Sequence, residues 1–388
     1  YPNKNLAGVG VALKLVCACE GESSKMLEMY GDLAAIGTVA DVMPLTGENR
    51  FLVHYGLSRI AKAPRPGIAA MFRESGTDAR HLTASTIGFS LAPRLNAAGR
   101  LGQASVAARL LMSQDENEAA ALAKELCELN RQRQSIETQI WQEANDIIKD
   151  SDPQEPIVLA SDRWHQGVIG IAASRIAEMY HRPTILFSES GGILKGSARS
   201  IDGVNIHEVL CCCREFFVRF GGHAKAAGIT MESAFFEDFR LKLNACLKTG
   251  YDDSMFIPCK RYEFDIPLEQ VTRELIAELT RLAPFGESNP SPVFRSRHVA
   301  VSRLRRFGSD AQHTKMDVSP SISSSAAPLD AVWFASAASY YRLLNADTVD
   351  ILYTPGINNW NGFDSIQLRV VSAKAEQPRD IDAYIEKG

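Results

Sequence analysis

The sequence lacks the features of a zinc protein, a secreted disulfide protein or a membrane protein. Its eight cysteines include three in succession, Cys211 to Cys213, but no CxxC or CxxH pair that would suit zinc. No apolar stretch approaches the roughly 18 residues that span a membrane. The first ten residues lack the basic and apolar segments of a signal peptide. These absences predict a cytoplasmic protein with reduced thiols and no membrane association.

The sequence also lacks an excess of positive charge. Its net charge is −4 at pH 7, so a nucleic-acid partner would have to be bound by local basic patches. Hydrophobic residues make up 45% and charged residues 23% of the chain, a balance typical of folded proteins. A length of 388 residues is too great for one hydrophobic core, so two or three domains are expected.

The amino-terminal region, residues 1–62, is predicted to be the end of an α/β unit. The apolar segment Asp32–Val39 is expected to form a strand, and a helix is expected near Asn49–Ile60. The Pro-rich segment 63–67 marks the end of this unit, because proline interrupts regular structure.

Residues 63–150 are predicted to be a helical connector. Asp115, with Glu118 three positions later, resembles a capping box at the start of a helix. Apolar residues then recur at a spacing of three to four as far as residue 147. Such a helix would be ~50 Å long. A helix of this length is expected to connect two domains.

The rest of the chain is predicted to form two further domains. Residues 151–252 alternate strands and helices, which favours a compact α/β domain. Residues 258–378 carry short strands separated by turns, which favours a small barrel such as an OB-fold. The expected strands are 157–160, 184–187, 193–199, 227–231, 299–303, 314–318, 331–334, 349–353 and 365–371, and the expected helices are 168–180, 206–219 and 235–247.

Asp41 is the first candidate for chemistry. If Asp32–Val39 is a strand, the carboxylate follows its carboxyl end, where α/β sheets place ligands. Divalent metal ions prefer hard oxygen ligands of this kind. An aspartate here can equally cap a helix or stabilise a turn. The residue types around Asp41 are compatible with both roles.

A second candidate is the segment APRLNAAGR, which contains Arg94, Asn96 and Arg100 among small residues. Guanidinium groups match phosphate oxygens with paired hydrogen bonds, and small neighbours let a ligand approach the backbone. The alternative is that these arginines form salt bridges between domains.

The α/β domain contains three further segments suited to an anion. His165 precedes a predicted helix whose first amides are unpaired. Ser197 and Arg199 lie two residues apart and therefore share one face of a strand. Gly221, Gly222 and His223 form a predicted glycine-rich turn. Each histidine can instead have a purely structural role.

The predicted barrel carries a cluster of basic residues, with Asp310 the sole acid between residues 295 and 315. A basic strand face suits the phosphate backbone of a nucleic acid, and Phe307 or Trp360 can stack on bases. The alternative is an ordinary solvated surface. The basic residues are Arg295, Arg297, His298, Arg303, Arg305, Arg306, His313 and Lys315.

Taken together, these segments resemble the RecJ family of the DHH phosphoesterase superfamily. The resemblance rests on GTVADVMPL, ENRFLVHYGL, APRLNAAGR, WHQGVIGIAASRIAEMYHRPTI, KGSARSIDGVNI, FGGHAKAAGIT and LAPFGESNPSPVF, in this order. It implies the carboxyl-terminal end of a DHH domain, a long linking helix, a DHHA1 domain and an OB-fold. It also implies a 5′-to-3′ exonuclease acting on single-stranded DNA in repair and recombination, with a single-stranded-DNA-binding protein and a helicase as partners of a monomer.

The resemblance further implies roles for individual residues. The family hydrolyses phosphodiesters with two Mn²⁺ or Mg²⁺ ions, and of its metal ligands only Asp41 has a counterpart, since no DxDADG or DHH motif occurs in this sequence. Ser197 and Arg199, with Arg100 or Arg94 close by, would bind the 5′-phosphate. His223, Gly221 and Gly222 would line the catalytic cleft, as would Asn96.

The presence of one metal ligand leads to a specific expectation. One carboxylate does not hold two metals, so this chain by itself is expected not to hydrolyse DNA. A non-catalytic module that binds single-stranded nucleic acid is therefore an alternative. A second alternative is an oligonucleotide or nucleotide phosphatase of the same superfamily, although such enzymes typically end after the DHHA1 domain.

Overall fold

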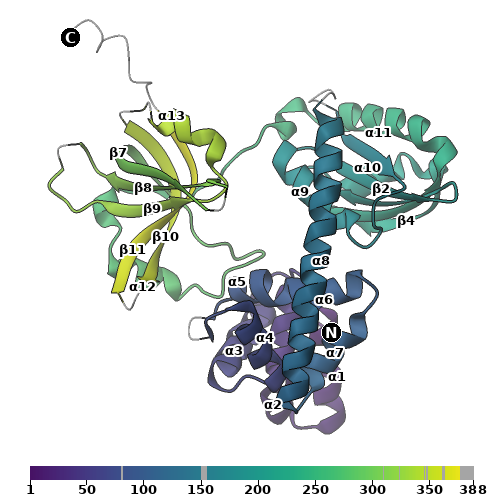
Figure 1. Ribbon diagram of the computed structural model, residues 1–388, viewed down its shortest axis with the longest axis horizontal. Helices are drawn as coiled ribbons and strands as arrows, with labels where there is room; N and C mark the ends of the chain where they lie inside the picture. Colours follow the sequence, from purple (N-terminus) through teal and green to yellow (C-terminus); the bar gives the residue numbers. More distant parts are fainter. Residues whose placement is uncertain are drawn as a thin grey trace, which may run out of the picture. The chain divides into compact units, whose positions relative to one another are not determined.

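The structure is a computed structural model that describes residues 1–79, 82–149, 155–308, 310–322, 324–344, 346, 348–360 and 363–375, without the side chains of Ala338 and Trp360 (Figure 1). It divides into two compact units. The first comprises residues 7–41 and 55–259, and the second comprises residues 1–6, residues 42–54 and the described residues from Lys260 on. The predicted region 1–62 is thus shared between the two units.

The amino-terminal part of the chain is helical. Residues 23–40 form one helix, so the predicted strand Asp32–Val39 is wrong. Its buried residues Gly31, Ala35 and Thr38 recur at a spacing of three to four, and a short apolar run does not distinguish a helix from a strand by pattern alone. The elements are α1 (Gly8–Glu20), α2 (Ser23–Ala40), α3 (Gly47–Lys62), α4 (Pro66–Ser75), α5 (Ala84–Thr86), the π-turn Ile87–Leu91, α6 (Ala92–Arg100) and α7 (Ala104–Met112).

The predicted long helix is α8 (Glu116–Ile148), which joins the small helices to the sheet of the first unit (Figure 1). Asp115 caps it by accepting a hydrogen bond from the Glu118 amide at 2.7 Å. The Glu118 side chain instead bonds Ser113 and Arg109, so the capping box is only half formed. The first half of α8 packs with α4, α6 and α7, and its second half packs with α9 (Ile169–Tyr180).

The α/β domain of the first unit is built on a five-stranded sheet in the order β1-β2-β3-β5-β4. Only β1 and β2 are parallel. Helices α10 and α11 pack on one face of the sheet, and α9 packs on β2 and β3 from the other. The elements are β1 (Ile157–Ser161), β2 (Thr184–Ser190), β3 (Ile193–Arg199), α10 (Ile206–Cys211), β4 (Phe217–His223), β5 (Ala226–Glu232) and α11 (Phe236–Gly250).

Two predictions in this domain are wrong. The helix expected over 206–219 ends at Cys211 and is followed by the short 3₁₀ turn Arg214–Phe216. The expected glycine-rich turn at 220–224 belongs to the edge strand β4 as far as His223. Pairing with β5 holds these glycines in extended backbone, and that pairing is not visible in the local sequence.

The second unit contains a closed five-stranded barrel, as predicted. The strands pair in the circular order β7-β8-β9-β11-β10, with β10 returning to β7 and with β9 and β11 parallel. Met316, Val318 and Leu368 fill the interior. The elements are β6 (Phe264–Asp265), α12 (Arg273–Thr280), β7 (Phe294–Phe307), β8 (His313–Ser319), β9 (Leu329–Trp333), α13 (Tyr340–Leu344), β10 (Thr348–Trp360) and β11 (Phe363–Ala375), with 3₁₀ turns at Ser233–Phe235, Asp253–Phe256, Leu268–Gln270 and Ala337–Ser339.

Part of the amino-terminal segment packs within this second unit. The Leu45 amide donates to the Glu287 carbonyl at 2.7 Å, and Arg50 donates to carbonyls at the end of α12, including that of Leu282 at 2.9 Å. None of the described helices of either unit is long and apolar enough to cross a membrane.

Candidate functional site

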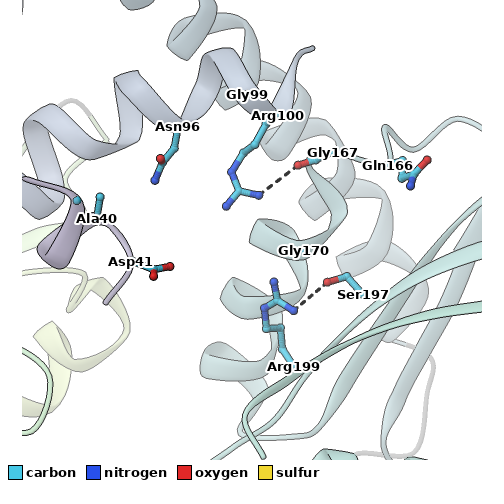
Figure 2. Close-up of a pocket in the computed structure, with 11 residues that line it drawn as sticks. Ala40, Asp41, Asn96, Gly99, Arg100, Gln166, Gly167, Gly170, Ser197 and Arg199 are labelled. Carbon is cyan, nitrogen blue, oxygen red and sulfur yellow. Dashed lines mark hydrogen bonds between the residues drawn. The ribbon is translucent and has the colours of Figure 1, made fainter. Parts of the chain in front are cut away.

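The first unit contains an open cavity of about 740 Å³ between helix ends and the sheet. Five residues singled out from the sequence line it: Asp41, Asn96, Arg100, Ser197 and Arg199. They come from the end of α2, from α6 and from β3. Figure 2 shows Asp41, Asn96, Arg100 and Arg199 directed toward a common space. The volume suits a small ligand such as a nucleotide.

Hydroxyl groups and a carbonyl orient the Arg199 guanidinium. Its Nε donates to Ser174 Oγ at 3.0 Å, and its Nη1 donates to Ser197 Oγ at 2.9 Å and to the Ala198 carbonyl at 2.7 Å. No acid in the described part of the chain forms an ion pair with Arg199. Its Nη2 group therefore remains available to a ligand, with Ser197 beside it.

Arg100 adds a second positive charge to this cavity. It donates to the Gly167 carbonyl at 3.3 Å and forms no ion pair with a described acid. Burial lowers the pKa of Arg100, as does the neighbouring Arg133, and Glu137 partly opposes them. Burial and then the charge of Arg100 lower the pKa of Arg199. Because the two cations destabilise each other, a bound anion would stabilise both.

Small residues make this arrangement possible. A side-chain carbon on Gly170, in the first turn of α9, would lie 2.8 Å from Arg199 Nη2 and 2.9 Å from Ser197 Oγ. One on Gly167 would lie 2.2 Å from the Arg100 carbonyl oxygen. Sequence reasoning missed Gly170 as a cavity residue. Gln166 and Gly167 belong to the segment before the predicted helix, and Gly99 belongs to the small-residue segment APRLNAAGR, so the sequence pointed to these three only through their segments.

Asp41 has an unusual position for a structural aspartate. It follows α2 as the residue that ends the helix, and its side chain makes no hydrogen bond or ion pair within the described residues. A negative charge at the carboxyl end of a helix opposes the helix dipole. Local structure therefore does not explain this carboxylate.

The metal pair implied by the resemblance does not fit these residues alone. Within the described ranges, no group of three or more His, Cys, Asp or Glu side chains is arranged to hold a metal ion. Asp41 is the single carboxylate among the cavity residues.

The other predicted residues of this unit lie outside the cavity. Arg94 donates to the Ser90 carbonyl. His165 Nδ1 accepts from the Gly167 amide at 3.1 Å, and His223 Nδ1 accepts from the Lys225 amide at 3.3 Å, so Nε2 of each exposed ring is free to donate. Gly221 lines a neighbouring cavity, whereas Gly222 fits tightly against β5.

The basic residues of the barrel are less available than the sequence indicates. Arg303 pairs with Asp317 at 2.5 Å, and Lys315 pairs with Asp330 at 2.9 Å. Asp265 pairs with Arg295 and with Arg297. Arg306 lies over the rings of Tyr340 and Tyr341. Of the predicted cations, Arg305 alone is exposed with no ionic or aromatic partner in the part of the barrel that the structure describes.

Three aromatic rings cluster beside these basic residues. The Phe307 and His313 ring centroids are 5.1 Å apart, and Phe334 lies 5.2 Å from His313 and 6.1 Å from Phe307. Arg369 lies over the Phe334 ring. Strands β7 and β8 and the residue after β9 supply the cluster. Trp360, the other predicted stacking residue, has a side chain outside the described part.

Two family models match separate parts of the chain. A DHHA1 domain matches residues 154–249, and a RecJ OB domain matches residues 262–372. The first lies within the α/β domain, and the second covers the barrel. The order and approximate positions agree with the resemblance drawn from the motifs.

Characterised relatives extend the similarity to almost the whole chain. The single-stranded-DNA-specific exonuclease RecJ of Bacillus subtilis is 38% identical over 97% of this chain and 48% of its own length. The corresponding protein of Dickeya dadantii is 36% identical over 95% of this chain and 67% of its own length. The chain thus spans half to two thirds of the length of these relatives.

Solved structures support the same assignment. RecJ from Thermus thermophilus, crystallised in complex with Mg²⁺, superposes with a TM-score of 0.77 at 32% identity, over 90% of this chain and 53% of that chain. The same protein in complex with Mn²⁺ gives a TM-score of 0.76. On the motifs, the two matching domains and identity to relatives over nearly its full length, the chain belongs to the RecJ family.

Proposed function

We propose that this chain is the part of a RecJ-type exonuclease that binds single-stranded DNA and recognises its 5′-phosphate. The cavity formed by Arg100, Ser197 and Arg199 holds the phosphate. Hydrolysis of the adjacent phosphodiester, in the 5′-to-3′ direction, is the activity of the whole protein in DNA repair and recombination.

The main support for this proposal is that Arg100 and Arg199 line the same cavity and that neither pairs with an acid in the described part of the chain. Surface arginines commonly pair with carboxylates, and the alternative of an interdomain or intradomain salt bridge requires one. Here hydroxyl and carbonyl oxygens orient Arg199 and leave its outer nitrogen toward the cavity. A terminal phosphate offers more charge and more acceptor oxygens than an internal diester, so it suits this pair best.

Asp41 is proposed to contribute one ligand to a site for two Mn²⁺ or Mg²⁺ ions, with the other ligands supplied from beyond these residues. Such ions activate water for attack on phosphorus. Its free carboxylate on the same cavity wall as Asn96 supports this role. His223, Gly221 and Gly222 are proposed to contact the strand near the reacting phosphate, since His223 shares a cross-strand row with Arg199 through Ala226.

The barrel is proposed to bind the strand farther from its 5′ end. The aromatic cluster of Phe307, His313 and Phe334 supports base stacking, and Arg305 supports a phosphate contact. Stacking on aromatic residues is tolerant of base sequence, which suits an exonuclease. We further propose that the whole protein acts as a cytoplasmic monomer, together with a helicase and a single-stranded-DNA-binding protein.

Binding of matched oligonucleotides tests 5′-phosphate recognition. The wild-type chain should bind a 5′-phosphorylated oligonucleotide roughly ten- to a hundredfold more tightly than its 5′-hydroxyl counterpart, because one charge-assisted contact contributes about 1.5–3 kcal/mol. Arg199→Ala should remove this preference. Arg240→Ala, which removes an exposed arginine from α11, should retain it. A preference that survives in Arg199→Ala would rule out the assignment.

Metal-dependent hydrolysis separates the nuclease from a non-catalytic binding module. The chain by itself should release no nucleotides with Mn²⁺ or Mg²⁺, and the whole protein should do so. Asp41→Ala in the whole protein should abolish release while leaving the 5′-phosphate preference intact. Activity that persists in Asp41→Ala would exclude Asp41 as a metal ligand.

A further inference from the structure

A second cavity, of about 680 Å³, lies over strands β3, β5 and β4 beside the start of α9 and shares Ser197 and Gln166 with the first cavity. We infer that this groove is a second phosphate-binding subsite, in which Lys195 and Arg219 hold another phosphate of the same DNA strand. The inference rests on the proposed function, because it places this phosphate next to the one bound by Arg199.

The strand register shows how the groove is built. Three cross-strand rows lie on the α9 face of the sheet: Arg199, Ala226 and His223; then Ser197, Gly228 and Gly221; then Lys195, Thr230 and Arg219. Successive rows are ~7 Å apart, since each is two residues farther along antiparallel strands. The first row contains Arg199 of the terminal-phosphate site, and the glycines of the second row form the floor of the groove. The third row places Lys195, Arg219 and the Thr230 hydroxyl at the end of the groove farther from Arg199.

The glycine floor indicates that the groove receives a ligand. Glycine inside a strand costs about 0.5–1 kcal/mol relative to alanine, and it often marks close approach by another molecule. A side-chain carbon on Gly221 or Gly228 would have nothing within 4 Å. No packing within the described chain therefore requires glycine at either position. A side chain there would instead fill the groove that joins the two cavities.

The charges in the groove favour an anion. No acid is among its lining residues. Arg219 is exposed on the edge strand β4 and has no hydrogen bond or ion pair with any described residue. Lys195 makes one long hydrogen bond, at 3.4 Å, to Gln166. Both cations are thus available, and Thr230 stands between them in the register. A DNA strand whose 5′-phosphate is bound at Arg199 would place one of its next phosphodiester groups beside these cations.

Neutral backbone linkages provide a direct test. A 5′-phosphorylated oligonucleotide is made with one uncharged methylphosphonate linkage at the first, second or third position, and its affinity for the 388-residue chain is compared with that of the all-phosphate strand. In the wild type, neutralising the linkage that lies in the groove should weaken binding about tenfold. In the Lys195→Ala/Arg219→Ala variant, the same neutral linkage should not lower the affinity, because the side chains that bind this phosphate have been removed.

Arg240→Ala/Lys248→Ala is the matched control, since both residues are exposed on α11, which packs on the opposite face of the sheet. It should behave as the wild type does. If each neutral linkage weakens the wild type and the groove variant equally, the groove is not a phosphate subsite, even with the 5′-phosphate preference intact. If the wild type shows no 5′-phosphate preference, the proposed function fails, and this inference fails with it.

Discussion

Removal of the negative charge of Glu137 should destabilise the first unit by about 3 kcal/mol. Glu137 accepts a hydrogen bond from Arg133 at 2.5 Å in the middle of α8, where the two side chains are 14% and 9% exposed. Arg133 also donates to Asn130 at 2.6 Å. Breaking a buried pair by removing one partner costs about 3–5 kcal/mol, because a charge is left buried without compensation. The small remaining exposure favours the lower end of that range.

The surroundings of this pair increase the expected loss. Glu137 also lies 3.9 Å from Arg175, so it is the acid shared by two guanidinium groups. Burial and Arg133 lower the pKa of Arg100, and Glu137 opposes this shift. Glu137→Gln keeps the shape of the side chain but leaves these three arginines without that negative charge. The substitution should therefore destabilise α8 and also the position of Arg100 in the phosphate cavity.

Thermal and urea unfolding of the variants measures this loss. At ~2–4 °C per kcal/mol for a unit of this size, the midpoint of Glu137→Gln should fall by about 6–12 °C. Glu128→Gln is the control, because Glu128 and Arg131 form an exposed pair in the same helix, and such pairs contribute less than about 1 kcal/mol. Arg133→Met/Glu137→Leu should recover most of the loss. If Glu137→Gln and Glu128→Gln lose equal stability, the reasoning is refuted.

Three further predictions concern the cavity and the barrel. Gly170→Ala should weaken binding of 5′-phosphorylated oligonucleotides about tenfold, or ~1.4 kcal/mol, because the added methyl group displaces Arg199 and Ser197. Gly250→Ala is the control, because the space around Gly250 is open. An unchanged affinity of Gly170→Ala in a direct titration would contradict this prediction. Phe334→Ala should cost single-stranded DNA binding about 1–3 kcal/mol without altering its salt dependence, since it removes stacking and no charge; an altered salt slope would argue against stacking. Arg295, and then Arg297, lower the pKa of Asp265 to about 2, below the unfolded value of about 3.9, so the stability that Asp265 contributes should be complete above that value and disappear as the pH falls toward 2. Unfolding of the wild type and Asp265→Asn between pH 2 and 7 should show two curves that converge at low pH, and a constant difference would contradict the assignment.

Much of the architecture could be predicted from local patterns. The period of two along β8 puts Thr314, Met316 and Val318 on one face of the strand, and all three are buried. The 3–4 spacing after Asp115 predicted α8, because a buried stripe on a helix has that period. Ser197 and Arg199 were placed on one strand face, and they share a hydrogen bond. These features depend on residues within a few positions of one another.

Predictions failed where distant contacts decided the local structure. The segment Asp32–Val39 is part of a helix, since its apolar residues pack against other helices rather than against a sheet. The region after Cys211 leaves its helix and becomes β4, because β5 offers backbone hydrogen bonds to Phe217–His223. Neither partner can be identified from the residues of the segment itself.

The sequence alone determined the family, the order of the domains and the residue types available for phosphate binding, because motifs and periodicities are local. Only the tertiary structure decided which of these residues meet. It brought Asp41, Arg100 and Arg199 to one cavity from three separate segments, and it left Arg94 and His165 outside. It also paired Arg303 with Asp317 and Lys315 with Asp330 across neighbouring strands. The charge that a ligand meets depends on such distances between side chains, and only the packing of distant segments sets them.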